Sequence, residues 1–193
     1  MERIALYIMG VKFTKNEMTE MENLLSDFLQ KHDITLSVPV DIFALATELG
    51  FDVRGAEFKG DLEGLVLVNE TVDKIELFNS NKIIAYNCQK SIEHKKFIVG
   101  HELAHYIEEK HKNPSKKIVY AARDHSKQYS TDTAEQRKDY LSAAMLMPKD
   151  VLIKEYKKKN IKNTKEICHE IADIFNVSDE MAKRRIEEVI NAW

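Results

Sequence analysis

The sequence predicts an α+β fold, in which a small β-sheet packs against several helices and a helical hairpin closes the chain. One observation is an apolar stripe at helical spacing over residues 15–31, formed by Met18, Met21, Leu24, Leu25 and Phe28. Another is a group of short strand-like runs between residues 51 and 86, separated by Gly60, Gly64 and an Asn-Ser-Asn turn. Strands gathered in one part of the chain and helices in the rest are typical of an α+β domain.

The individual elements follow in order from these patterns. The stripe over 15–31 is expected to pack into the core, with a groove for a partner as the alternative. A second helix is predicted over 39–49 and ends at Gly50, and a longer helix begins after Ser91, a suitable N-cap. Another helix starts near Glu135 and stops before a proline. Strands are predicted over residues 51–58, 65–69, 74–78 and 82–86, and a polar loop over 112–133.

The composition argues against several classes of protein. The 193 residues carry 29 Lys and Arg against 32 Asp and Glu, a net charge of -3, so no basic excess marks a nucleic-acid-binding chain. No stretch approaches the ~20 apolar residues of a membrane span. The short apolar run over 2–11 is unlike a signal peptide and is expected to be a strand or a lead into a helix. Cys88 and Cys168 lie far apart and are interpreted as reduced thiols of a cytoplasmic protein.

The most informative motif is H-E-L-A-H at residues 101–105. Each helical residue turns by about 100°, so His101 and His105 lie ~40° apart on one face and can reach one metal ion. Glu102 lies about 60° from His105 and can accept a proton from a water that the metal activates. The flanking residues are apolar, and burying two histidines and a glutamate without a partner is unfavourable. The motif therefore predicts a metal site rather than an ordinary helix.

A zinc site needs a third protein ligand, and the residues alone leave several candidates. His111 has the spacing of the longer H-E-x-x-H-x-x-G-x-x-H motif. Glu108, however, occupies the glycine position at which the chain would leave the helix. Glu135 opens a later helix that also carries apolar residues, which suggests a ligand or a buried pair. Three further acids compete with it, namely Asp124, Asp132 and Glu109.

A second segment gives the chain its resemblance to a known family. H-E-L-A-H is followed by E-Q-R-K-D-Y-L-S-A-A-M-L-M-P over residues 135–148. The combination resembles the ImmA/IrrE metallopeptidases, which have H-E-L-G-H and then E-x-x-A-N-x-F-A-x-x-L-L-M-P. The resemblance covers about residues 38–150 and, more weakly, the tail. It implies that Glu135 joins His101 and His105 in holding one zinc ion per chain, with Glu102 as the general base.

This sequence departs from the family pattern at several positions. Ala104 replaces a glycine, and Lys138, Asp139, Leu141 and Ser142 replace Ala, Asn, Phe and Ala. Asp139 lies one turn from Glu135, so it can orient a ligand histidine or remain a solvated helix residue. These changes bear on substrate fit more than on zinc binding.

The resemblance also implies a function and a partner. Residues 1–150 would form a zincin-like metallopeptidase domain, and the substrate would be a helix-turn-helix transcriptional repressor of a phage, mobile element or stress response. The alternative is a zinc-stabilised regulatory module that binds DNA or protein with little proteolysis. Glu102 favours the enzyme, because a structural zinc site needs no base and closes its fourth position with another ligand. Candidates for stabilising the oxyanion are His125, Tyr129 and Tyr106.

The C-terminal region, residues 151–193, has a pattern of its own. The segment over 164–186 indicates a helix, a tight turn and a second helix, similar to a helix-turn-helix. Lys183, Arg184 and Arg185 are candidates for phosphate contacts with DNA. The basic cluster is short and acidic residues surround it, so a helical hairpin packed on the catalytic domain is the favoured interpretation.

Overall fold

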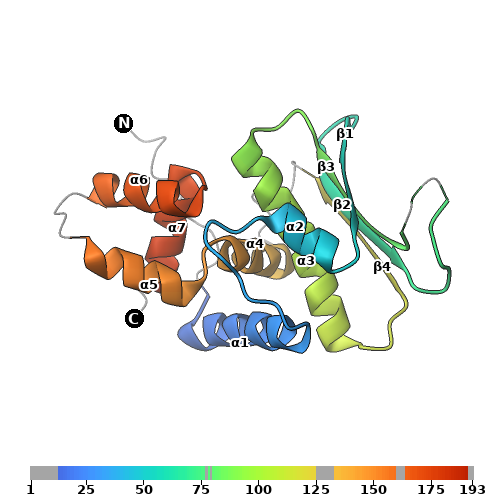
Figure 1. Ribbon diagram of the computed structural model, residues 1–193, viewed down its shortest axis with the longest axis horizontal. Coiled ribbons are helices and arrows are strands. Elements are labelled where there is room, and N and C mark those ends of the chain that lie inside the picture. Colours follow the sequence, from blue (N-terminus) through green and yellow to red (C-terminus); the bar gives the residue numbers. More distant parts are fainter. Residues whose placement is uncertain (1–12, 77, 79, 125–132, 160–163, 191–193) are drawn as a thin grey trace.

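The computed structural model describes residues 13–76, 78, 80–124, 133–159 and 164–190. The run over 2–11 lies outside the described residues. Figure 1 shows the sheet at one end of the molecule, α3 and α4 in the middle, and α5, α6 and α7 at the opposite end. The elements are α1 (Lys15–Lys31), α2 (Ile42–Glu48), β1 (Asp52–Ala56), β2 (Leu62–Asn69), β3 (Lys82–Asn87), α3 (Ile92–Lys112), β4 (Ile118–Asp124), α4 (Thr133–Leu146), α5 (Lys149–Lys158), α6 (Thr164–Phe175) and α7 (Asp179–Val189). The predicted α+β class is confirmed.

The sheet has four strands in the order β1-β3-β2-β4. β1 and β3 are parallel, whereas β2 runs antiparallel to both β3 and β4. Val66, Val68 and Ile84 are fully buried on the face that α3 covers. The sheet thus supports the helix that carries the H-E-L-A-H motif.

Two sequence predictions about strands are wrong. Residues 74–78 form no strand in the described part of the chain, because backbone hydrogen bonds from Ile75 to Ser80 and from Phe78 to Ile75 close turns there. β4 lies within the segment predicted as a polar loop. Its sequence lacks the alternation of apolar and polar residues that predicts a strand. Val119 is buried, but its apolar neighbours Ile118 and Tyr120 are about half and two thirds exposed, 52% and 67%.

Helix ends follow the local capping chemistry. Thr14 and Glu17 form a capping box at the start of α1, and the Ser91 hydroxyl accepts from His94 N at 3.3 Å at the start of α3, as predicted. The predicted helix over 39–49 is shorter, because Asp41 caps it by accepting hydrogen bonds from two backbone N–H groups. Gly50 follows this helix with a φ of 88°, a conformation that a glycine adopts without strain.

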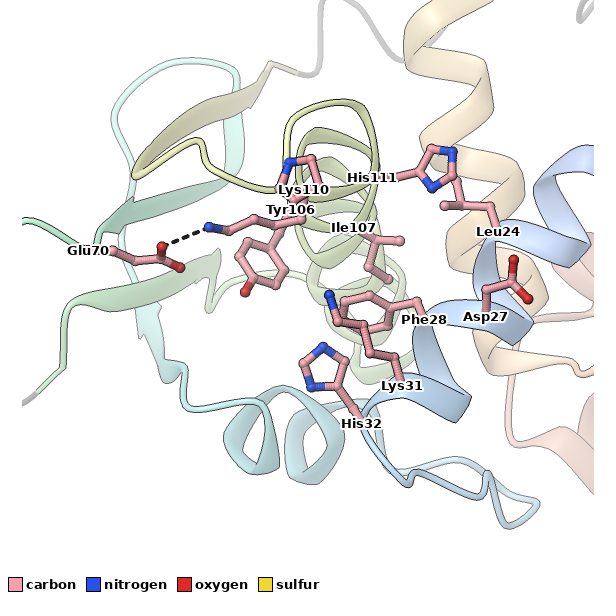
Figure 2. A pocket seen from close by; sticks show the side chains of 11 residues that line it. Leu24, Asp27, Phe28, Lys31, His32, Glu70, Tyr106, Ile107, Lys110 and His111 are labelled. Atoms are coloured by element: carbon pink, nitrogen blue, oxygen red, sulfur yellow. Dashed lines mark hydrogen bonds and ion pairs between the residues drawn. The ribbon is translucent and has the colours of Figure 1, made fainter.

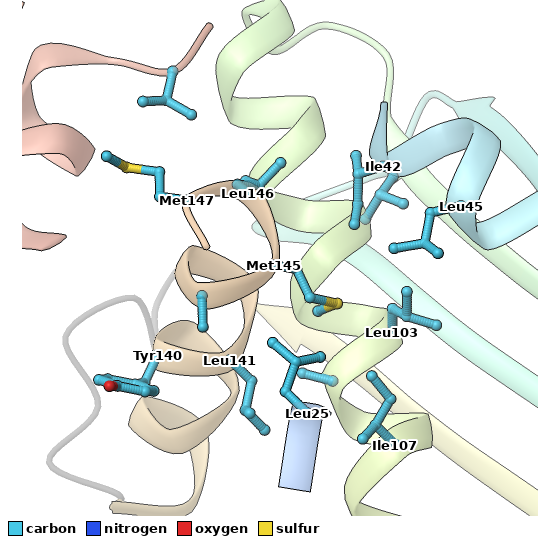
Figure 3. Close-up of a cluster of buried hydrophobic side chains, with 14 of the residues drawn as sticks. Leu25, Ile42, Leu45, Leu103, Ile107, Tyr140, Leu141, Met145, Leu146 and Met147 are labelled. Carbon is cyan, nitrogen blue, oxygen red and sulfur yellow. The ribbon is translucent and has the colours of Figure 1, made fainter. Parts of the chain in front are cut away.

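The core gathers around α3 and α4. The stripe predicted on α1 is buried at all five positions, which confirms packing rather than an open groove. Figure 3 shows Leu103 and Ile107 of α3 facing Leu141 and Met145 of α4, with Leu25 of α1 beside them. α3 and α4 approach closely because Gly100 has no side chain: a Cβ there would overlap the Ser142 hydroxyl. That hydroxyl donates to Phe97 O at 2.9 Å.

The C-terminal helices form the predicted hairpin. α6 and α7 are joined by a turn in which Asn176 has a φ of 53° and Ser178 caps α7. Arg185 of α7 is fully buried, pairs with Glu22 of α1 and donates from Nε to Met147 O at 3.3 Å. The interpretation of Arg185 as a phosphate contact is therefore wrong. Within the described residues, no helix has the length and apolar character needed to cross a membrane.

Candidate metal centre

The two motif histidines lie together on α3. The helix continues without a break from Ile92 to Lys112, so His101 and His105 project from consecutive turns of one face. Their Nε2 atoms are 3.2 Å apart, and the two side chains are 1% and 11% exposed. The two imidazoles can therefore bind the same metal ion.

Glu135, in the first turn of α4, completes the cluster. Its Oε2 lies 3.2 Å from His101 Nε2 and 3.7 Å from His105 Nε2. In a tetrahedral site with zinc–ligand bonds of about 2.0–2.1 Å, ligand atoms are about 3.3 Å apart. The donor set and its spacing fit a metal ion with three protein ligands. In the described residues this is the one cluster of three or more His, Cys, Asp or Glu side chains with such spacing.

Asp139 lies one turn further along α4 and contacts the other side of the His101 ring. Its Oδ1 is 2.8 Å from His101 Nδ1. A carboxylate there accepts the Nδ1 proton and leaves the lone pair of Nε2 directed at the metal position. Of the two interpretations left open by the sequence, the geometry favours the orienting role.

The electrostatics of the cluster favour metal-binding protonation states. Burial, together with the charge of His101, lowers the pKa of His105 to about 4, so this imidazole is neutral at pH 7. A proton on His101 Nε2, shared with Glu135 Oε2 at 3.2 Å, is the main reason that the pKa of Glu135 falls to about 2, and a bound metal would replace this proton. A neutral imidazole and an ionised carboxylate are the forms that bind a metal.

Glu102 points between α3 and the sheet and is fully buried. Its Oε1 lies against Gly64 of β2, where an added Cβ would be 2.9 Å from that oxygen. The sequence interpretation treated Gly64 as a separator between strands, whereas it is part of β2. A glycine inside a strand signals close approach of another group, but the predicted strand began at residue 65 and left Gly64 outside it.

Glu108 forms a buried ion cluster that the sequence interpretation missed. It is 2% exposed, and its carboxylate forms ion pairs with two residues of α4, Lys138 Nζ at 2.9 Å and Arg137 Nε at 3.0 Å. Glu108 follows His105 by three residues and Lys138 follows Glu135 by three, so the pair joins the ligand helices one turn beyond the ligands. Burial alone would raise the pKa of Glu108, but Lys138 and Arg137 lower it overall.

Of the other candidates from the sequence, the described residues His111, Tyr106 and Glu109 do not join this cluster. Because α3 stays helical, His111 lies on another face, where it lines a cavity of ≈ 330 Å³ between α1 and α3 (Figure 2). Tyr106 lines the same cavity, and its hydroxyl accepts from Lys82 Nζ at 3.1 Å. Glu109 pairs with Lys116. His125, Tyr129 and Asp132 lie outside the described residues, as does the side chain of Asp124.

One known protein family has a model that matches most of this chain. Residues 46–187 match the model of the M78 peptidases, described as the IrrE N-terminal-like domain. The match spans well over half of the chain and includes α3 and α4. The chain belongs to this family. It is therefore a metallopeptidase by family, and the predicted resemblance is confirmed. No curated protein matches the chain.

Proposed function

We propose that the protein is a zinc-dependent endopeptidase in which His101, His105 and Glu135 hold one zinc ion and Glu102 is the general base. The observation that supports it best is the convergence of two imidazoles and one carboxylate, with separations of 3.2, 3.2 and 3.7 Å, beside a buried Glu102. Three protein ligands leave a fourth position open, as catalytic zinc sites do and structural sites do not.

In the proposed hydrolysis, Glu102 transfers the proton and Asp139 orients a ligand histidine. Bound zinc lowers the pKa of water and polarises the scissile carbonyl. Glu102 accepts the proton of the attacking water and delivers it to the departing amine when the peptide C–N bond breaks. Asp139 holds the His101 ring in one tautomer and orientation, so that the ligand geometry stays fixed during turnover.

β4 is the proposed docking strand for the substrate. It is the last strand of the described sheet, and Gly64, which contacts Glu102, pairs with Arg123 of β4. An extended peptide that adds to the outer edge of β4 would be held there by backbone hydrogen bonds, with β4 between it and β2. This mode favours substrates that can present an extended segment.

We further propose that the substrate is a helix-turn-helix transcriptional repressor. This step is supported by the resemblance of H-E-L-A-H and the Glu135 segment to the ImmA/IrrE metallopeptidases. It implies that the enzyme works in the cytoplasm, where an indiscriminate protease would be harmful. Cleavage at a restricted site is therefore expected.

Metal analysis of the purified protein tests the site. The wild type is expected to bind one zinc per chain, and Glu135→Ala to bind it much more weakly, because two histidines leave the ion under-coordinated. Glu109→Ala, which removes an acid of α3 paired with Lys116, is the matched control and should retain the metal. If Glu135→Ala retained the full amount of zinc, the third ligand would have to be another residue.

Proteolysis is tested with Glu102→Gln, which keeps the shape of the side chain but cannot accept a proton. This variant should bind zinc and lose turnover of a repressor encoded beside the gene. Rapid digestion of casein by the wild type, with the repressor untouched, would refute restricted cleavage. Zinc binding with no hydrolysis of either would favour the regulatory alternative.

A further inference from the structure

Gly64 occupies an unusual position in the sheet. It lies in β2, between β3 and β4, and pairs with Tyr86 on one side and Arg123 on the other. A Cβ at Gly64 would overlap Ile98 Cγ2 and lie 2.9 Å from Glu102 Oε1 and 3.3 Å from Ala85 O. Distances below 3.0 Å essentially never occur for real Cβ atoms, so any side chain at this position must displace α3 or its side chains.

The neighbouring positions show that the missing side chain is specific to this point. Side chains alternate along a strand, so Gly64, Val66 and Val68 share the face that α3 covers. Val66 and Val68 are fully buried, and each fills the space between sheet and helix. At Gly64 a side chain of the helix, Glu102, approaches the strand backbone instead.

The strand geometry is also disturbed at this point. Leu62 pairs with Asp124, but Gly64 pairs with Arg123, so β2 contains one extra residue there. Such a bulge bends a strand locally and is common beside active sites. A glycine in a strand interior is destabilising by roughly 0.5–1 kcal/mol relative to alanine, so its presence here needs a local reason.

We propose that Gly64 is a positioning residue for Glu102: its missing side chain forms the slot in which the Glu102 carboxylate is held. This rests on the proposed role of Glu102 as the general base. A methyl group at position 64 pushes the carboxylate out of the slot while leaving His101, His105 and Glu135 in place. A displacement of about 1 Å can lower a catalysed rate by about 100-fold, so the shift of about 0.5 Å needed here should lower it by roughly 10-fold.

Gly64→Ala also collides with Ile98, so the packing effect must be separated from the effect on Glu102. Ile98→Ala removes Cγ2 and relieves that overlap, but leaves the contact with Glu102. The informative protein is therefore Gly64→Ala/Ile98→Ala, compared with Ile98→Ala alone. Gly55→Ala is the matched control, because it also adds a Cβ to a strand of this sheet. That Cβ would lie 3.2–3.4 Å from atoms of Cys88 and Tyr86, and Glu102 is not among its neighbours.

Crystal structures of the zinc-loaded Ile98→Ala protein and the double variant give a readout independent of activity. The carboxylate of Glu102 is expected to move by about 0.5 Å in the double variant, the shift that turns the 2.9 Å approach into an ordinary contact, with zinc content and ligand positions unchanged. A carboxylate that stays within its slot overturns the proposal, whether or not the protein is a peptidase.

Cleavage of the repressor encoded beside the gene gives the second readout. Relative to Ile98→Ala, the double variant should lose roughly 10-fold in kcat with KM little changed, and Gly55→Ala should match the wild type. Equal kcat in Ile98→Ala and the double variant overturns the proposal. If neither the wild type nor any variant cleaves the repressor, the proposed function fails and the displacement in the crystal alone decides the role of Gly64.

Discussion

Replacing Glu108 by leucine should destabilise the protein strongly, although Glu108 is not a proposed ligand. The substitution leaves the Lys138 ammonium, whose side chain is 8% exposed, without the carboxylate that it contacts at 2.9 Å. Arg137 and Lys112, which also contact Glu108, are 27% and 62% exposed and can turn to water. Most of the lost stability is therefore expected to come from the unpaired charge of Lys138.

The magnitude follows from the burial of this pair. Removing one partner of a buried ion pair is destabilising by about 3–5 kcal/mol. For a chain of this size, about 3 kcal/mol corresponds to a fall in Tm of roughly 6–12 °C. Glu108→Leu/Lys138→Met replaces both charges by apolar groups, which is often neutral, so this variant should lie within about 1 kcal/mol of the wild type.

Urea and thermal unfolding of the metal-free proteins, followed by circular dichroism with a chelator present, measure these differences without a contribution from metal binding. Lys112→Met is the control and should change stability by less than about 1 kcal/mol, because this lysine is mostly exposed. Equal destabilisation in Glu108→Leu and the double variant would refute the reasoning, since it would mean that the two charges do not depend on each other.

The same pair predicts a dependence on pH. The pKa of Glu108 is lowered in the folded protein from its ordinary value of 4.5. Its contribution is therefore present above about pH 4.5 and is lost as the pH falls through the lowered pKa. The stability of the wild type relative to the double variant should thus decrease below pH 4.5, and a constant difference down to pH 3 would contradict the assignment.

Three further predictions concern the packing and orientation of the site. Asp139→Ala should weaken zinc binding by about 10–100-fold in a competition titration, and an unchanged affinity would argue against an orienting role. Gly100→Ala should lower the free energy of unfolding by about 1–3 kcal/mol, and Ser142→Ala in the same chain should restore part of it, because the overlap is with the Ser142 hydroxyl. Arg185→Met should be destabilising by about 3 kcal/mol or more in urea unfolding, because Glu22 loses a fully buried partner.

The sequence predicted the features that depend on local periodicity and spacing. The stripe of α1, the cap at Ser91 and the single face shared by His101 and His105 follow from residues within a few turns of one another. The approach of Glu135 depends on tertiary packing, and it was ranked first only through the resemblance to a family. The spacing of the residues alone left His111 as an alternative third ligand.

The features that the sequence did not predict depend on how separate elements meet. The pairing of Glu108 with Lys138 requires the relative placement of α3 and α4. The slot at Gly64 requires the placement of α3 on β2. β4 was missed for another reason: it is a short apolar run within a polar segment, and the exposed Ile118 and Tyr120 remove the apolar–polar alternation expected of a strand with one buried face.

The contact between Arg185 and Glu22 limits how the protein can be shortened. The segment that defines the family begins at residue 46, yet α1, which precedes it, supplies the carboxylate for Arg185 and covers α4 with its apolar stripe. A fragment reduced to the family segment would keep a buried guanidinium without its counter-charge and expose apolar side chains of α4 to water. The smallest unit suited to biochemical work therefore begins before Thr14, the residue that caps α1, and extends through α7.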